Sequence, residues 1–227
     1  MSIRENLEAI RAEIDAAARE TGRTGADITL VGASKMNDAA ACQEAIAAGV
    51  NALGENRVQE MTAKLAEDAY RGAPLHFIGH LQRNKVKQVV GKVALIQSIG
   101  SPELLAEVDK QAEKLGIVQD ILLEINAGGE KQKSGFLLKE FPRIVEEMAD
   151  YPAVRVRGLM TVPPIGRKKG DNCRYFAEMR NLFVDISAKK YDNVSMECLS
   201  MGMSGDYPDA IREGATMIRT KGEPGTG

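Results

Sequence analysis

The chain alternates short apolar runs with helical segments eight times, and this alternation constrains its fold more than any other feature. The predicted strands are Ile28–Ala33, Ala52–Gly54, Leu75–Ile78, Ala94–Gln97, Asp120–Ile125, Val154–Leu159, Met196–Leu199 and Thr216–Arg219. Helical patterns fill the gaps, at Asp38–Ala48, Val58–Ala69, Asn84–Val90, Pro102–Leu115, Leu138–Ala149, Asn172–Ala188 and Pro208–Glu213. Such alternation is typical of a parallel α/β sheet, and eight units in a chain of this length predict a (β/α)8 TIM barrel.

An additional helix is predicted before the first strand. Its apolar residues recur three and four positions apart, at Ile3, Leu7, Ile10 and Ile14. This spacing is typical of an amphipathic helix, which we expect over about 3–20. We predict one domain over residues 1–227, in which this helix precedes a single barrel over about 28–219 and a tail at 220–227.

A doubly wound open sheet is the competing α/β fold. Its nucleotide-binding form carries a glycine-rich fingerprint directly after the first strand. In this chain the first predicted strand is followed by Ser34-Lys35-Met36, without that fingerprint. We therefore favour the closed barrel.

Charge and cysteine content narrow the class of function. The 227 residues carry a formal net charge of -2, which provides no basic field for nucleic acid. No apolar run is long enough to span a bilayer, and the first residues lack the apolar core of a signal peptide. The three cysteines, Cys42, Cys173 and Cys198, are far apart and odd in number, which argues against a disulfide framework. We expect a cytoplasmic monomer that binds neither nucleic acid nor membrane.

Lys35 stands directly after the first predicted strand, in Ala33-Ser34-Lys35. A lysine at the end of a buried strand is costly unless it has a task, because burial disfavours the charged ammonium. A neutral amine at that place can form a Schiff base with an aldehyde. Lys35 is therefore either the anchor for a carbonyl compound or an ordinary lysine at a strand exit.

Polar residues follow most of the predicted strands. They are Lys35, Glu55-Asn56, Gly79-His80, Asn126, Met160-Thr161, Ser200–Asp206 and Arg219. Each of them alone is typical of a solvated loop. In a (β/α)8 barrel, however, chemistry takes place on the loops that follow the carboxyl ends of the strands. Their convergence on one face therefore predicts a single functional site.

The segment after the seventh predicted strand, Ser200–Asp206, contains two glycines and leads into the predicted helix Pro208–Glu213. Backbone N–H groups before a helix attract anions, and glycine lets a phosphate approach closely. Barrels often bind phosphate at the loops after strands seven and eight. Such a turn is also common as a helix cap, but its place in the barrel makes Ser204 and Gly205 candidates for a phosphate site.

Three motifs suggest other chemistry and are rejected. Gly202-Met203-Ser204-Gly205 begins like the elbow of a serine hydrolase, but Asp206 replaces the last glycine and no histidine follows. His76 and His80 would lie roughly 13 Å apart on a strand, too far to share one metal ion. Gly222–Gly227 resembles the start of a P-loop but lacks the lysine that completes one. We predict no metal site.

Six segments that occur in order along the chain form a specific set. They are Ser34-Lys35, Gly54–Glu60, His76–Gln82, Lys133-Ser134-Gly135, Arg157–Met160 and Ser200–Asp206. This set resembles the pyridoxal phosphate homeostasis proteins, and the likeness covers nearly the whole chain from about 28 to 219. The resemblance implies a single (β/α)8 barrel like the N-terminal domain of alanine racemase.

The resemblance also implies pyridoxal 5′-phosphate (PLP) as the cofactor, held through a Schiff base on Lys35. The other contacts are carried over by motif: phosphate at Ser204 and Gly205, the ring at Asn56 and Met160, and the pyridine nitrogen at Arg219. An arginine at that nitrogen would keep it unprotonated and weaken the ring as an electron sink. The family is regarded as carriers or regulators of PLP supply. The implied function is therefore PLP homeostasis, with no catalytic residue and with apo PLP-dependent enzymes as recipients.

Two segments depart from the family pattern. The family usually has a second lysine and a proline after Ser-Lys, whereas Met36-Asn37-Asp38 follows here, so one cation near Lys35 is missing. After the arginine of the eighth strand, the family continues with an Ile-Gly-Thr segment that supplies phosphate-binding N–H groups. This chain reads Thr220-Lys221-Gly222 instead. Either Thr220 and Lys221 substitute for that segment, or phosphate binding is weaker.

Two rival functions would use the same lysine. A PLP-dependent amino-acid racemase needs a second acid–base group on the opposite face of the ring, commonly a tyrosine, and Tyr207 is the only tyrosine near a predicted site loop. A phosphosugar-type barrel enzyme would instead join Lys35 to its own substrate. Glu55 is the only nearby carboxylate for that reaction, which makes this third function the weaker one.

Overall fold

The computed structural model describes residues 2–131 and 134–221. Its strands are β1 (Thr29–Ala33), β2 (Ala52–Glu55), β3 (Leu75–Phe77), β4 (Leu95–Ile99), β5 (Gln119–Glu124), β6 (Val154–Met160), β7 (Val194–Ser200) and β8 (Met217–Thr220). Each pairs in parallel with the next, and β8 pairs with β1, so the sheet closes on itself. The predicted (β/α)8 barrel is confirmed.

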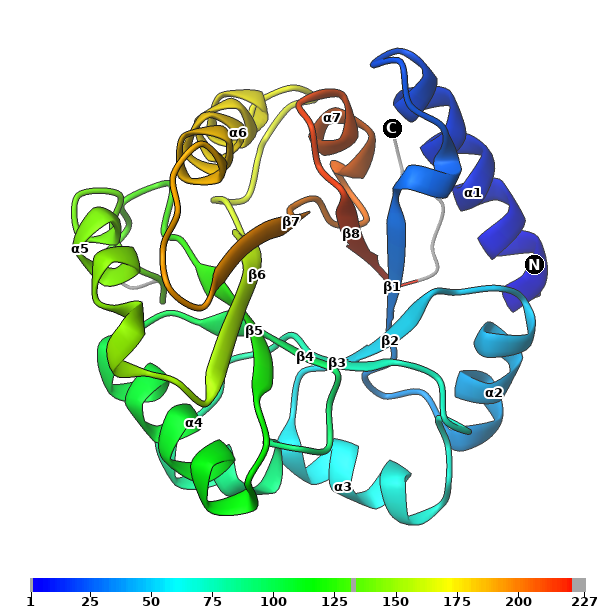
Figure 1. The fold of residues 1–227 in the computed structure, drawn as a ribbon. Helices are drawn as coiled ribbons and strands as arrows, with labels where there is room; N and C mark the ends of the chain where they lie inside the picture. Colours follow the sequence, from blue (N-terminus) through cyan, green and yellow to red (C-terminus); the bar gives the residue numbers. More distant parts are fainter. Residues whose placement is uncertain (1, 132–133, 222–227) are drawn as a thin grey trace.

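The helices surround the strands in sequence order (Figure 1). They are α1 (Ile3–Arg19), α2 (Ala39–Ala47), α3 (Val58–Ala66), α4 (Pro102–Leu115), α5 (Phe141–Glu146), α6 (Cys173–Ser187) and α7 (Tyr207–Arg212). Three 3₁₀ helices complete the described part of the chain, namely η1 (Gly25–Asp27), η2 (Arg83–Gln88) and η3 (Met148–Asp150).

The predicted N-terminal helix is α1, and its beginning is set by a capping box. The Ser2 hydroxyl accepts from the Glu5 amide (3.1 Å), and the Glu5 carboxylate accepts from the Ser2 amide (3.0 Å). Its apolar stripe is buried, at Leu7, Ile10, Ile14, Ala17 and Ala18. The helix packs against α7 on one side and α2 on the other, so it covers the seam where β8 meets β1 (Figure 1).

The helix predicted over Asn84–Val90 is a 3₁₀ helix, η2, rather than an α-helix. Val86 and Val89 are both buried and lie three residues apart. That spacing fits the three-residue turn of a 3₁₀ helix, in which positions i and i+3 face the same way. The segment is therefore tighter than the sequence pattern indicated.

The single helix predicted over Leu138–Ala149 is divided into α5 and η3. Pro142 lies in the first turn of α5, the part of a helix in which proline is tolerated because its N–H would be unpaired anyway. The helix therefore begins later than predicted, at Phe141. It ends at Glu146, and the chain tightens into the 3₁₀ turn of η3.

The buried apolar side chains form two clusters. The larger one contains residues of both strands and helices and lies between the two layers. The buried members of the smaller one come from strands alone: Val31, Ala52, Leu95, Leu122, Met160 and Met217. Since side chains on a barrel strand alternate between outside and inside, this second cluster fills the interior of the barrel.

A chain of polar side chains crosses the same interior. Ser200 Oγ donates to Gln97 Oε1 (2.6 Å), and Gln97 Nε2 donates to His76 Nδ1 (2.9 Å). Because an amide nitrogen only donates, Nδ1 of His76 is the acceptor and carries no proton. Burial lowers the pKa of His76 to about 4, so the imidazole is neutral at pH 7.

His76 is expected to make folding stability depend on pH. An unfolded histidine titrates near 6.5, so between that pH and about 4 the unfolded chain binds the extra proton and the folded chain loses stability as the pH falls. We expect this residue to remove roughly 3 kcal/mol of unfolding free energy between pH 7 and pH 4. Urea denaturation of the native chain and of His76→Gln at both pH values tests this. Equal pH dependence in the two proteins would contradict it.

Candidate functional site

The carboxyl ends of the eight parallel strands meet at one mouth of the barrel (Figure 1). The predicted site residues lie at or just after the ends of these strands. They are spread over five strand ends: Lys35 after β1, Asn56 after β2, Met160 at the end of β6, Ser204 and Gly205 after β7, and Arg219 near the end of β8. Closure of the barrel makes β8 a neighbour of β1. Residues that are far apart in the sequence thus share one opening.

Lys35 is exposed and lies just beyond the end of β1. β1 ends at Ala33, and the chain turns immediately, with the Asn37 amide donating to the Ser34 carbonyl (3.1 Å). Ser34 itself is buried. The turn therefore carries Lys35 out of the barrel wall and makes it accessible from solvent.

A buried polar network lies behind this turn and centres on Glu55, which is 0% exposed. Lys64 Nζ of α3 donates to Glu55 Oε1 (2.8 Å) and to the Ser34 carbonyl (2.7 Å). The Tyr70 hydroxyl donates to the same carboxylate oxygen (3.0 Å), and Ser34 Oγ donates to it as well. Burial alone would lower the pKa of Lys64, but its hydrogen bonds to Glu55 and Glu60 outweigh burial and raise it. Lys64 is therefore a charged partner of Glu55.

Arg219 lies on the β8 side of the mouth and is 3% exposed. Its Nη2 donates to the Thr161 carbonyl at the end of β6 (2.8 Å), whereas its Nε has no partner among the described residues. Burial lowers the pKa of Arg219 to about 10, with Glu124 and Asp206 opposing the shift. The guanidinium is thus charged at neutral pH and keeps one buried donor available.

The loop between β7 and α7 contains Ser204 and Gly205. Among the hydrogen bonds between described residues, the backbone N–H groups of these two residues have no acceptor. A Cβ built on Gly205 would meet nothing within 4 Å, so the space beside the loop is open. Since α7 has only six residues, its dipole is small, and the donors of the loop itself are what an anion would meet.

Thr220 and Lys221 adjoin this loop. The Lys221 amide donates to Ser204 Oγ (3.1 Å), and the Thr220 hydroxyl lies 3.3 Å from the same oxygen. They follow Arg219, where the sequence analysis places the departure from the family pattern. The remainder of the predicted tail, 222–227, lies outside the described residues, as does Lys133 of the Lys-Ser-Gly motif.

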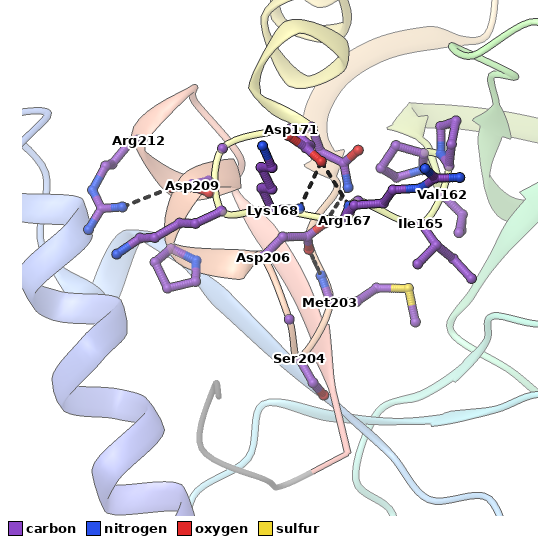
Figure 2. Close-up of a pocket in the computed structure, with 18 of the residues that line it drawn as sticks. Val162, Ile165, Arg167, Lys168, Asp171, Met203, Ser204, Asp206, Asp209 and Arg212 are labelled. Atoms are coloured by element: carbon purple, nitrogen blue, oxygen red, sulfur yellow. Dashed lines mark hydrogen bonds and ion pairs between the residues drawn. The ribbon is translucent and has the colours of Figure 1, made fainter. Parts of the chain in front are cut away.

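A cavity of about 890 Å³ opens beside the β7–α7 loop (Figure 2). It is bounded by this loop, by the β6–α6 loop and by α1. Its charged lining residues are four basic and four acidic side chains: Arg167, Lys168, Lys169 and Arg212, and Glu13, Asp171, Asp206 and Asp209. Asp171 caps the β6–α6 loop by accepting from the Arg167 and Lys168 amides (2.8 Å each). Of the six predicted site residues, only Ser204 and Gly205 line this cavity. The other four do not line it.

Asn56 and Met160 are positioned by packing. Gly79 is the second residue after β3. A Cβ built on it would lie 2.3 Å from the Asn56 carbonyl oxygen. Glycine is required for so close an approach, and it fixes where the β2–α3 connection runs. Met160 is fully buried in the interior cluster, so it lies beneath the mouth.

The sequence analysis did not identify two residues, Glu124 and Lys64, as candidate site residues. Glu124 ends β5, is buried and accepts from Ser134 Oγ (2.6 Å). Lys64 was also missed, because a lysine four residues after Glu60 is typical of a solvated helix face. The signal that could have revealed Glu124 is its position, a carboxylate that directly follows the apolar run Ile121-Leu122-Leu123 at the end of a strand.

Tyr207, the tyrosine considered for a racemase, is fully buried and donates its hydroxyl to Glu13 Oε2 of α1 (2.6 Å). It is therefore held away from the mouth by a charge-assisted hydrogen bond. His76 lies in the barrel interior and His80 is exposed, so the two histidines form no pair.

Two features of residues 2–131 and 134–221 bear on other classes of function. In these two ranges, no three His, Cys, Asp or Glu side chains gather into a group that could hold a metal ion. No helix of the described chain is long and apolar enough to cross a membrane.

Known proteins resemble this chain over nearly its whole length. The family model described as the alanine racemase N-terminal domain matches residues 5–220. The pyridoxal phosphate homeostasis protein of Aquifex aeolicus (strain VF5) is 40% identical over 219 residues, which is 96% of this chain and 95% of that protein.

Two solved structures are similar as well. The crystal structure of an unknown protein from Bifidobacterium adolescentis has a TM-score of 0.90 at 33% identity, covering 96% of this chain and 92% of that one. PipY of Synechococcus elongatus PCC7942, solved with PLP bound, has a TM-score of 0.80 at 31% identity, with 96% and 97% covered.

The buried pair of Glu55 and Lys64 yields a stability prediction. Lys64→Met would leave a carboxylate in the interior without its cation, which typically costs about 3–5 kcal/mol of unfolding free energy. The double variant Lys64→Met with Glu55→Gln removes that charge as well, so we expect it to regain much of the loss. Urea denaturation measures both. A single variant within about 1 kcal/mol of the native chain would show that the pair is unimportant.

Proposed function

The chain belongs to the pyridoxal phosphate homeostasis protein family, whose barrel is that of the alanine racemase N-terminal domain, and we propose that it binds PLP through a Schiff base on Lys35. One observation carries this proposal: an exposed lysine shares the barrel mouth with donors that have no partner among the described residues. A relative of the same fold is described with PLP bound, which supports it.

The residues at the mouth fit the chemical groups of PLP. The open N–H groups of Ser204 and Gly205 suit a phosphate, because a backbone donor to an anion makes a strong hydrogen bond. The unpartnered Nε–H of Arg219 can donate a hydrogen bond to the pyridine nitrogen, which accepts it. When bound, PLP supplies an aldehyde that reacts reversibly with amines. The Lys35 amine adds to the aldehyde carbon, and the carbonyl oxygen leaves as water.

We infer that the chain stores and releases PLP rather than turning over a substrate. Arg219 stays charged at neutral pH and can only donate, so it would keep the pyridine nitrogen unprotonated. Tyr207, which a racemase could use as its second acid–base group, is bound to Glu13. Both observations favour the homeostasis function over the racemase alternative.

The exposure of Lys35 also favours the release of bound PLP. A Schiff base that water can reach is hydrolysed back to the free amine and aldehyde, so PLP bound here can leave again. PLP-dependent enzymes that lack their cofactor are the recipients that we infer.

The central test is spectroscopic. PLP added to the purified chain is expected to produce the visible absorbance band of a Schiff base, and borohydride reduction followed by peptide mapping should locate the adduct at Lys35. Lys35→Ala should abolish both. Lys92→Ala is the matched control, because Lys92 is an exposed lysine just before β4, at the opposite end of the barrel. No band in the native chain, or an unchanged band in Lys35→Ala, would refute the proposal.

The phosphate subsite has its own test. Ser204→Ala keeps the backbone N–H but removes the side-chain hydroxyl, which we take as a further donor to the phosphate. A hydrogen bond to an anion is worth about 1.5–3 kcal/mol, so PLP should bind about 10- to 100-fold more weakly. Pyridoxal lacks the phosphate, and its affinity should not change. Ser195→Ala, an exposed serine near the start of β7, serves as the control. Equal losses for both ligands would place the phosphate elsewhere.

A further inference from the structure

The residue after Lys35 has an unusual backbone conformation. Met36 has a φ of 63°, in the left-handed region, which costs a residue other than glycine roughly 1–2 kcal/mol. Its side chain is 91% exposed, so packing does not hold it there. Backbone strain at one position persists only where the surroundings impose it.

The restraint comes from α3. The Met36 amide donates to Glu60 Oε1 (2.6 Å), and Lys64 Nζ donates to that same oxygen (2.9 Å). Lys64 Nζ also donates to the Ser34 carbonyl (2.7 Å). The peptide groups on either side of Lys35 are therefore both bound by one pair of side chains, which lie one turn apart on a single helix.

This pair is itself anchored. Lys64 donates to the buried Glu55 of β2, and the Tyr70 hydroxyl binds the same carboxylate from beyond the end of α3. The Asn37 amide closes the turn onto the Ser34 carbonyl (3.1 Å). The direction in which the chain leaves β1 is thus set by β2 and α3 rather than by the strand that precedes Lys35.

We propose that Glu60 and Lys64 are positioning residues for Lys35, which hold the backbone of the turn so that the amine faces an incoming aldehyde. They act through the peptide groups of Ser34 and Met36. The proposal rests on the proposed function, because it takes the aldehyde to be that of PLP. Misplacement of a reacting group by about 1 Å can slow a reaction about a hundredfold, so such a restraint has a measurable effect.

Glu60 is the residue to change, because its side chain is partly exposed and its loss spares the buried Glu55–Lys64 pair. We expect Glu60→Ala to slow Schiff-base formation between Lys35 and PLP by about tenfold or more, measured by stopped-flow absorbance. Glu60→Gln keeps an amide oxygen as acceptor for the Met36 N–H and should react at nearly the native rate. Glu67→Ala, an exposed acidic residue just after the same helix, is the matched control.

A second variant separates positioning from simple loss of stability. Met36→Gly adopts a positive φ without cost, so in the Glu60→Ala background it should recover part of the lost rate. A merely structural role for Glu60 would lower the unfolding free energy without affecting the rate. Absence of any recovery by Met36→Gly would show that the left-handed turn is not what Glu60 maintains.

Amide hydrogen exchange tests the restraint without PLP. The Met36 amide should be protected in the native chain and in Glu60→Gln but should exchange rapidly in Glu60→Ala. If that protection is lost while the reaction with PLP keeps its native rate, the positioning role is overturned and the proposed function stands. If the native chain forms no Schiff base with PLP, the proposed function fails, and the positioning role fails with it.

Discussion

The ion pair between Glu55 and Lys64 is the interaction on which the arrangement of the mouth depends. It joins β2 to α3, and the same lysine holds the Ser34 carbonyl where β1 ends. A buried charge is tolerated only when partners surround it, and Glu55 Oε1 has three donors, from Ser34, Lys64 and Tyr70. Because each donor comes from a different segment, the network ties the position of the turn to the barrel wall.

The mouth divides into two sides of different chemistry. On the β1–α3 side, a restrained turn carries an accessible lysine. On the β7–β8 side lie a loop with open space beside Gly205 and the buried guanidinium of Arg219. Barrel closure brings the two sides together, since β8 pairs with β1. The neighbouring cavity is lined by four basic side chains, among them Lys168 in Figure 2, and by four acidic ones, Glu13, Asp171, Asp206 and Asp209, so its formal charges balance.

Particular elements show where sequence reasoning succeeded and where it did not. The strand–helix alternation sufficed for the barrel, because the periodicity of burial is a local property that the chain carries in every unit. The same reasoning predicted an α-helix at η2, where a three-residue spacing indicates a 3₁₀ turn. It also gave no sign of the left-handed conformation of Met36 in the turn at Lys35. Lys64 escaped because a glutamate and lysine four residues apart are typical of a solvated helix face, and its burial depends on β2.

The sequence by itself determined the fold class, the family and the strand ends at which polar residues lie, since these follow from periodicity and from motifs that are contiguous in the chain. Only the tertiary structure decided that Lys35 is exposed, that Met36 is held in a left-handed turn, and that Arg219 is buried with a donor left over. Burial and hydrogen bonding at these positions depend on neighbours supplied by distant segments. The charged and hydrogen-bonding groups of the mouth come together only when the barrel closes.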